Sequence, residues 1–323
     1  MPESRPDPLE RLAIVVVTFN RSAYLDALLA SIEAMSTGPW RVVVVDNAST
    51  DDTAAVLDRW RQRLGDDLID VLAQAENTGG AGGFSAGTAR ALDLGAEWLW
   101  LMDDDVEVLP DALADLTPWL RRFRCVTGRK YDFDGTPFRW QNRFDDFLGV
   151  PRPLKGDPFR PDGWFEQTAG NFEGMAIHRS VVERIGLPDP RFFIVWDDAI
   201  YGWLAHLETE CAVVDAFVLR RARVLQQRRI GAKNLNATGD RYRFYVMRNR
   251  ALMRFYLRDR GRLNAFGFAL GTLYTFAKEL VRLVRVERRV TGAGELVRGW
   301  LASRRLMRDP DWQPMPPLAG ATA

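Results

Sequence analysis

The chain has 323 residues, 47% of them hydrophobic and 27% charged, which is enough to bury a large core in one large domain or two small ones. Its formal net charge of +1 excludes the overall basic field that nucleic-acid-binding proteins use. Two cysteines, Cys125 and Cys211, are too few for a disulfide framework and fit a reducing cytosol. Residues 1–10 are polar and proline-rich, without the pattern of a signal peptide, so we expect a flexible leader.

Four apolar runs in the first part of the chain predict the buried strands of a parallel sheet. The runs are residues 12–18, 41–47, 68–72 and the one that begins at Trp98. Helical segments with apolar residues on one face separate them, and this alternation predicts an α/β fold, a Rossmann-like and mostly parallel sheet flanked by helices. Polar residues follow the strands, namely Thr18, Asp46, Asn77 and Asp103. Since ligands of such sheets lie beyond the carboxyl ends of the strands, the pattern predicts a nucleotide-binding crevice there.

Three consecutive carboxylates, Asp103, Asp104 and Asp105, follow the fourth strand directly. Like charges this close raise one another's pKa unless a positive charge is present. Hard oxygen ligands suit Mg²⁺ or Mn²⁺, ions that usually also hold a substrate's phosphates. The alternative is a solvated acidic turn that caps the next helix, which Pro110 and Asp111 would open.

A glycine loop at residues 79–83 precedes the third helix. It has neither the GxGxxG spacing nor the lysine that ends a P-loop. Glycines let the backbone approach a ligand closely, and the following helix N-terminus favours an anion. The alternative is a flexible surface turn.

Four segments, in this order, resemble the motifs of inverting GT-A glycosyltransferases of the family 2 type. They are residues 15–21, 44–51, 77–83 and 101–105. The sequence Asn-Thr-Gly-Gly-Ala-Gly-Gly-Phe is most similar to bacterial galactofuranosyltransferases and their rhamnosyltransferase relatives. The resemblance covers about residues 11–257, which would form the GT-A catalytic domain, with a nucleotide-sugar half at 11–124 and an acceptor half at 125–257.

The resemblance implies roles for the residues at the strand ends. Asp103 and Asp105 would form the DxD pair that holds Mg²⁺ or Mn²⁺, and Asp104 would reach the donor sugar or its ribose. Thr18 and Asp46 would contact the uridine or thymidine of the donor. The other implied donor-binding residues are Asn20, Asn77, Gly79 and Gly80.

The segment Trp196-Asp197-Asp198 offers a general base. Inverting sugar transfer needs a base that removes the acceptor hydroxyl proton, and a carboxylate beside a second carboxylate and an indole has a raised pKa that suits this task. The alternative is a helix N-cap whose acids favour the helix dipole, and both can hold at once. By resemblance to the galactofuranosyltransferase base motif, Asp198 is the base, Asp197 orients the acceptor, and Trp196 offers a face to a sugar ring.

The sequence departs from the family pattern after this motif. The family usually supplies a metal-binding His at the end of a later strand, but here residues 213–219 lead to Arg220 and residues 223–225 lead to Gln226. His206 comes too early, in the helix after the base. Either the metal keeps two protein carboxylates, or Arg220 partly replaces the cation's charge, or activity is reduced.

The rest of the second half gives weaker signals. We expect residues 125–165 to be loops that shape the acceptor side, with a hairpin turn at 131–135, and residues 171–180 to be a strand before a short helix. Residues 242–250 predict a helix whose arginines face the diphosphate or whose pattern is only structural. Residues 258–323 predict a basic amphipathic helical extension that suits an anionic membrane surface or packs on another subunit.

Taken together, the sequence predicts a metal-dependent inverting glycosyltransferase. It would move galactofuranose from UDP-galactofuranose onto a lipid-linked or polysaccharide acceptor. We expect a cytoplasmic protein, peripheral on the inner face of the cell membrane, that binds no nucleic acid and can form a homo-oligomer. The alternatives are a dTDP-rhamnose-dependent rhamnosyltransferase, an impaired nucleotide-sugar-binding protein, and a nucleotidyltransferase, which has no use for the motif at 196–198.

Overall fold

A central mixed sheet organises the molecule. The computed structural model describes residues 7–138, 142–222, 227–230, 233–236 and 239–318. The strands of the sheet are β1 (Leu12–Thr18), β2 (Arg41–Asp46), β3 (Ile69–Ala73), β4 (Trp98–Asp103), β5 (Val106–Val108), β6 (Cys125–Tyr131), β7 (Pro137–Phe138), β10 (Trp164–Glu166), β11 (Met175–His178) and β12 (Cys211–Arg221). Their order is β10-β12-β6-β11-β4-β1-β2-β3, with β5 paired to β12 and β7 paired to β6.

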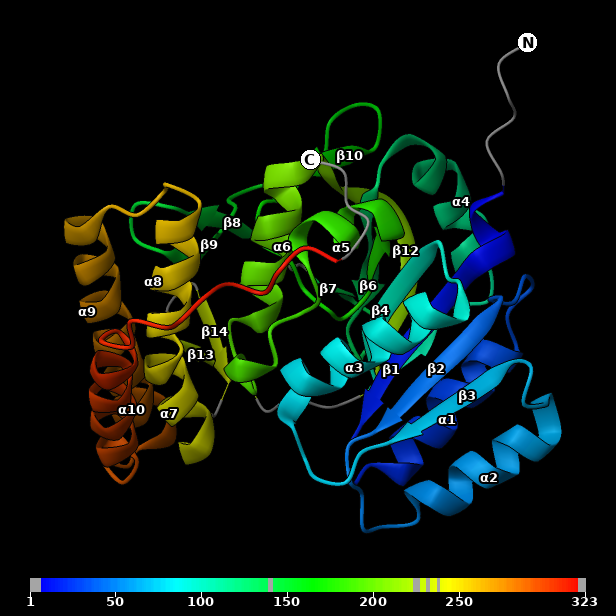
Figure 1. The fold of residues 1–323 in the computed structure, drawn as a ribbon, viewed down its shortest axis with the longest axis horizontal. Coiled ribbons are helices and arrows are strands. Elements are labelled where there is room, and N and C mark those ends of the chain that lie inside the picture. The colour runs from blue at the N-terminus through cyan, green and yellow to red at the C-terminus, as the bar shows by residue number, and fades with distance from the viewer. Residues whose placement is uncertain (1–6, 139–141, 223–226, 231–232, 237–238, 319–323) are drawn as a thin grey trace.

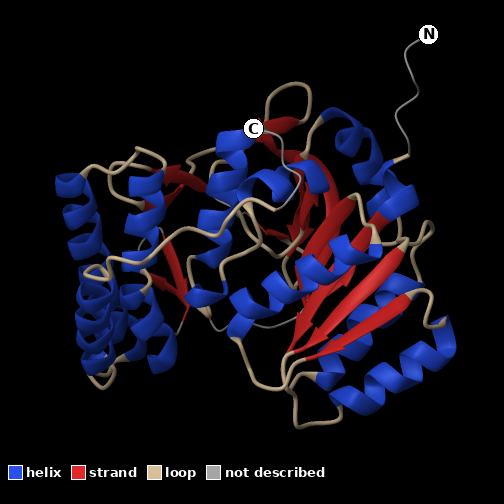
Figure 2. Cartoon of the chain, in the orientation of Figure 1, coloured by secondary structure: helices blue, strands red, loops and turns tan. Residues whose placement is uncertain are grey.

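Helices cover both faces of this sheet (Figure 2). The helices of the first 210 residues are α1 (Ser22–Glu33), α2 (Thr53–Leu64), α3 (Gly79–Leu94), α4 (Ala112–Arg122), α5 (Arg179–Ile185) and α6 (Asp197–Glu208). Alternate residues of β1 enter two separate cores: Val15 packs in the core that includes residues of α3, and Val16 in the core that includes residues of α1 and α2. Because both faces are buried, an unbroken β-branched run forms this strand, and β1, β2, β3 and β4 pair in parallel as predicted.

The second half of the chain completes the sheet. β11 runs antiparallel between β4 and β6, and β12 runs parallel to β6. The expectation that residues 125–165 are only loops is wrong, because β6 lies inside the sheet. Its sequence Cys-Val-Thr-Gly-Arg-Lys-Tyr mixes apolar and charged residues and therefore lacks the signal of a buried strand. The predicted hairpin turn at 131–135 is confirmed, since it joins the antiparallel β6 and β7.

Helices gather at one end of the molecule, away from β3 (Figure 1). They are α7 (Asp240–Arg248), α8 (Arg250–Asp259), α9 (Ala265–Val281), a π-helical turn at Arg282–Glu287 and α10 (Ala293–Leu306). This confirms the predicted helical C-terminal region. Two small hairpins complete the fold, β8 (Asn142–Asp145) with β9 (Val150–Pro153), and β13 (Gln227–Ile230) with β14 (Lys233–Asn236). Among the described residues, no helix is both long enough and apolar enough to cross a membrane.

Candidate active site

The acidic run sits where β4 ends, and residues of the β1 end hold it. Asp104 is 1% exposed and accepts hydrogen bonds from Thr18 Oγ1 at 2.7 Å and from Arg21 Nη1 at 2.8 Å. The same Arg21 nitrogen lies 3.2 Å from Asp105 Oδ2. Burial raises the pKa of Asp104, while the Arg21 charge opposes that rise. The run is therefore a packed part of the sheet edge rather than a solvated turn.

Asp103 is the last residue of β4, and its side chain has no hydrogen bond or ion pair with any residue that the structure describes. Burial raises its pKa well above the usual range, and the charges of Asp105, Glu173 and Asp104 raise it further. The charges of Arg21 and Lys130 act on this carboxylate, but neither forms an ion pair with it among the described residues. This excess of negative charge fits a divalent cation held by Asp103 and Asp105. Within the described ranges, no group of three or more His, Cys, Asp or Glu side chains is arranged to hold a metal ion.

Two arginines lie at the end of β12, near the position at which the family pattern has a metal-binding His. Arg220 Nη1 lies 3.9 Å from Glu107 Oε2, and its side chain is 47% exposed. The next residue, Arg221, turns to the other side of β12 and places Nε 3.1 Å from Glu173 Oε1. The other candidate position, Gln226, lies outside the described residues. His206 lies in α6 with Nδ1 3.3 Å from Glu166 Oε1, away from the acidic run.

A buried lysine forms an ion pair with Glu173. Lys130 of β6 is 3% exposed, donates to the Glu173 carbonyl at 2.8 Å and lies 3.3 Å from Glu173 Oε1. Burial lowers the Lys130 pKa, whereas the charges of Glu173 and Asp103 raise it. The Lys130 charge in turn lowers the pKa of Asp198. The Lys130 charge therefore acts on both Asp103 and Asp198.

The candidate base begins α6. Asp197 and Asp198 are its first residues, and Asp198 Oδ1 accepts the Ala199 amide at 2.7 Å. Both carboxyls keep partial access to solvent but are surrounded by protein, and this desolvation raises the pKa of Asp197 to about 6. Desolvation and the charge of Asp197 raise the pKa of Asp198 to about 7. The N-cap residue of α6 is Trp196 and forms no side-chain cap hydrogen bond, so neither acid is the N-cap; both lie in the first turn, where negative charge favours the helix dipole.

The loops that follow β1 and β2 are hydrogen-bonded to each other, at the place where the nucleoside is predicted to bind. Asn20, at a φ of 52°, accepts the Thr50 amide at 2.7 Å through its side chain. Asp46, 9% exposed, accepts the Ser49 amide at 2.9 Å. The hydroxyl of Thr18 is already bonded to Asp104.

The glycine loop forms the first turn of α3. Asn77 Oδ1 accepts the Gly79 amide at 2.8 Å, and the Phe193 carbonyl accepts the Ala81 amide at 3.1 Å. A Cβ on Gly79, which has a φ of 74°, would lie 2.0 Å from that carbonyl oxygen, whereas a Cβ on Gly80 would meet nothing within 4 Å. Gly79 therefore serves close packing inside the protein, and Gly80 faces open space where a ligand can approach.

The helix α7 contacts the loop that carries the candidate base. Trp196 Nε1 donates a hydrogen bond to the Val246 carbonyl at 3.1 Å, which joins this helix to the residue before Asp197. Arg250 is fully buried and donates to the carbonyls of Leu148 and Phe268 at 2.9 and 3.2 Å, which assigns it to packing rather than to the diphosphate.

Sequence reasoning missed Arg21, Lys130 and Glu173 as neighbours of the acids.

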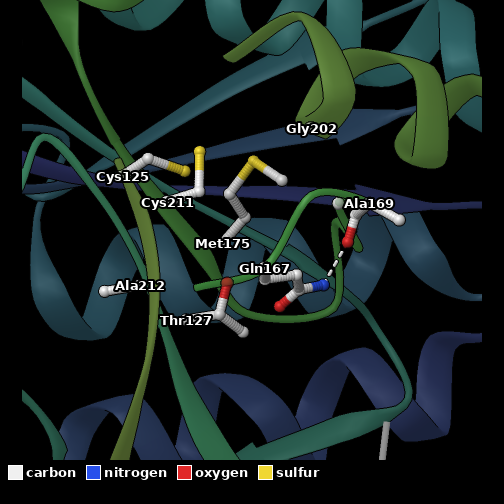
Figure 3. A pocket seen from close by; sticks show the side chains of 9 residues that line it. Cys125, Thr127, Gln167, Ala169, Met175, Gly202, Cys211 and Ala212 are labelled. Atoms are coloured by element: carbon white, nitrogen blue, oxygen red, sulfur yellow. Dashed lines mark hydrogen bonds between the residues drawn. The ribbon is translucent and has the colours of Figure 1, made fainter. Parts of the chain in front are cut away.

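A small cavity of about 10 Å³ lies elsewhere, between β6, β11 and β12 (Figure 3). The side chains of Cys125, Cys211 and Met175 line it, together with that of Gln167. Gln167 Oε1 is buried without a hydrogen-bond partner among the described residues. A cavity of this size has room for about one water molecule. None of the candidate acids lines it, so it is not the substrate site.

Comparison with known proteins identifies the family of this chain and several proteins of similar sequence. The model of the family described as "Glycosyl transferase family 2" matches residues 13–186. Galactofuranosyltransferase GlfT1 of Mycolicibacterium smegmatis is 35% identical over 207 residues, 58% of this chain and 63% of that protein. The one of Mycobacterium tuberculosis is 29% identical over 208 residues, 58% and 62% of the two chains. The chain thus spans less than two thirds of the length of these relatives. A Campylobacter jejuni protein named GalNAc(5)-diNAcBac-PP-undecaprenol beta-1,3-glucosyltransferase is 31% identical over 240 residues, 74% of this chain and 72% of its own.

Solved structures share the fold. TarS residues 1–349 of S. aureus, in complex with UDP-GlcNAc, has a TM-score of 0.57 at 14% identity and covers 92% of this chain and 81% of its own. GalNAc-T7 with UDP, GalNAc and Mn²⁺ has a TM-score of 0.56 at 14% identity, with 91% and 54% covered. At such identities the likeness shows the fold alone, and it confirms the predicted GT-A architecture.

Proposed function

Since the chain belongs to glycosyl transferase family 2 and is a glycosyltransferase, we propose that it transfers galactofuranose from UDP-galactofuranose to a lipid-linked or polysaccharide acceptor, with inversion. The observation that carries this choice of sugar is the 29–35% identity to two galactofuranosyltransferases. The charge of Lys130, which acts on both Asp103 and Asp198, supports a site able to do this chemistry.

Each residue of the candidate site has its own role in the proposed reaction. Asp198 takes the proton of the acceptor hydroxyl as that oxygen bonds to the anomeric carbon, and the bond from that carbon to the UDP oxygen breaks on the opposite face. Asp197 orients the acceptor, and Trp196 offers a face to its sugar ring. When bound by Asp103 and Asp105, Mg²⁺ or Mn²⁺ would supply positive charge for the departing diphosphate.

The donor side is formed by the ends of β1, β2 and β4 with the start of α3. Asp46 and Asn20 would border the nucleoside, with Thr18 holding Asp104 toward the ribose or sugar. Asn77 orients the Gly79 turn, and Gly80, with open space at its Cβ position, would let the diphosphate approach the backbone.

The C-terminal helices offer a surface for a lipid-linked acceptor. Phe266 and Leu273 of α9 are 69% and 66% exposed and lie on one helical face, and Arg285 and Arg288 follow on the exposed side of the next turns. Apolar side chains beside basic ones fit the surface of an anionic bilayer. The names of relatives include lipid carriers, PP-undecaprenol and dolichyl-phosphate. We infer peripheral binding at the inner face of the cell membrane, and a contact between two copies of the chain is the competing use of this face.

A second candidate donor is UDP-glucose, because the glucosyltransferase relative covers more of this chain than the galactofuranosyltransferases do. Calorimetric titration of the protein with UDP, dTDP and GDP, each with Mn²⁺ and with chelator, tests the donor class. Metal-dependent preference for UDP is expected. Preference for dTDP would favour rhamnosyl transfer instead, and binding of no nucleotide would overturn the proposal.

A further inference from the structure

The loop that leads to Asp197 has an unusual backbone. Phe193, Val195 and Trp196 all have left-handed conformations, with φ of 64°, 75° and 70°. Side chains other than glycine disfavour this region, and a β-branched residue such as valine disfavours it most. Phe193, with ψ of −59°, is the centre of a strained γ-turn in which the Ile194 amide donates to the Phe192 carbonyl at 2.8 Å.

One fully buried side chain holds this loop. Asn249, between α7 and α8, is 0% exposed. Its Nδ2 lies 2.9 Å from the Phe192 carbonyl oxygen and 2.8 Å from those of Ile194 and Val195. The amide has two hydrogens for three acceptors, so one hydrogen is shared.

Neighbouring groups fix the same segment. Trp196 Nε1 donates to the Val246 carbonyl at 3.1 Å, and Arg248 donates to the Arg191 carbonyl. From the donor half, the Ala81 amide donates to the Phe193 carbonyl. Strained conformations persist only where the surroundings over-determine them, and they concentrate at functional sites.

We propose that Asn249 is a positioning residue that holds the strained loop in the conformation presenting Asp197 and Asp198 to the acceptor. This inference rests on the proposed role of Asp198. Without the Asn249 amide, the carbonyl oxygens of Phe192, Ile194 and Val195 each lose one hydrogen bond. The left-handed conformations keep their energetic cost, so the loop relaxes and both acids move.

The test compares Asn249→Ala with Leu257→Ala. Leu257 lies in α8, the helix that follows Asn249, but its side chain lies near Gly149 rather than the base loop, so its truncation reports loss of packing alone. We expect Asn249→Ala to lower kcat by roughly 10²-fold below the melting temperature, because small misplacement of reacting groups has effects of that size. The affinity for UDP should stay within about twofold, since the donor side is not altered. Leu257→Ala should change stability and leave kcat near that of the wild type.

Hydrogen exchange gives a readout that needs no turnover. Asn249→Ala should exchange faster in the peptide spanning residues 190–198, while peptides of β1 and β4 keep their wild-type rates. Equal kcat in Asn249→Ala and wild type, or an unchanged rate in that peptide, would overturn the inference. If the wild type transfers no sugar, the proposed function is wrong, but the role of Asn249 is still tested. In that case the hydrogen-exchange rate of the peptide spanning residues 190–198 decides whether Asn249 positions the loop.

Discussion

The backbone amide of Ala81 donates a hydrogen bond to the carbonyl oxygen of Phe193 at 3.1 Å. This bond joins the first turn of α3, which we propose to lie on the donor side, to the loop that carries the candidate base. Gly79 makes the approach possible, because a Cβ there would overlap the same carbonyl. Since the amide is already bonded within the protein, this end of α3 fixes the position of the glycine turn relative to the loop that leads to Asp198.

The pH dependence of turnover should report Asp198. Burial and the charge of Asp197 raise its pKa to about 7, and only the carboxylate can accept a proton. We therefore expect kcat to fall about tenfold per pH unit below about pH 7. Asp197→Asn removes the neighbouring charge and should move this limb to lower pH. A limb at the same pH in both proteins would contradict the electrostatic assignment.

The same shift has a consequence for stability. The folded-state pKa of Asp198 lies above that of an unfolded aspartate, so the folded state binds more protons between about pH 4 and 7. The stabilising contribution is present below about pH 4 and is lost as the pH rises through about 7. The melting temperature of Asp198→Asn relative to wild type should accordingly increase between pH 5 and 8, and a pH-independent difference would contradict this.

The metal assignment predicts that Asp103→Ala and Asp105→Ala abolish the Mn²⁺ dependence of UDP binding. Each removes one of two carboxylates available to the ion, and we expect at least a tenfold loss of affinity in the presence of Mn²⁺. Asp67→Ala, at an exposed position in the turn before β3, is the matched control. Calorimetry with and without chelator makes the measurement. Wild-type affinity in both variants would exclude these residues as ligands.

The membrane proposal predicts co-sedimentation with vesicles of phosphatidylcholine and phosphatidylglycerol, reduced by salt and weak on phosphatidylcholine alone. The double variant Phe266→Ser with Leu273→Ser should lose most of this binding, because it removes two exposed apolar side chains of α9. Phe133→Ser, on the exposed β6–β7 hairpin, is the control. Undiminished vesicle binding in the double variant would reject this face, and a change from dimer to monomer would assign it to a subunit contact.

The sequence predicted the strands and the candidate site best where an apolar run is followed directly by polar residues. Apolar runs that end in polar residues located the strands and brought Thr18, Asp46 and Asp103 to one edge of the sheet. The partners of these residues were harder to predict. Lys130 and Glu173 meet through the pairing of β6 with β11, which lie far apart in the chain, and β6 carries no clear strand pattern.

The base loop could not be predicted for a different reason. The motif at 196–198 identified the acids, but local preference opposes a left-handed valine at position 195. Only tertiary contacts, chiefly those of Asn249, make that backbone favourable. The sequence indicated a helix at residues 242–250, yet whether its arginines face the diphosphate or pack within the protein depends on tertiary packing that no periodicity encodes.

The most direct measurement is UDP release from UDP-galactofuranose, with and without a polyprenyl-diphosphate-linked oligosaccharide, by wild type and Asp198→Asn. Donor affinity is measured in parallel on both proteins. We predict acceptor-dependent release by the wild type, and release about 10²–10⁴-fold slower by the variant at unchanged donor affinity. Turnover of the variant at the wild-type rate, or no release from this donor by the wild type, would contradict the account.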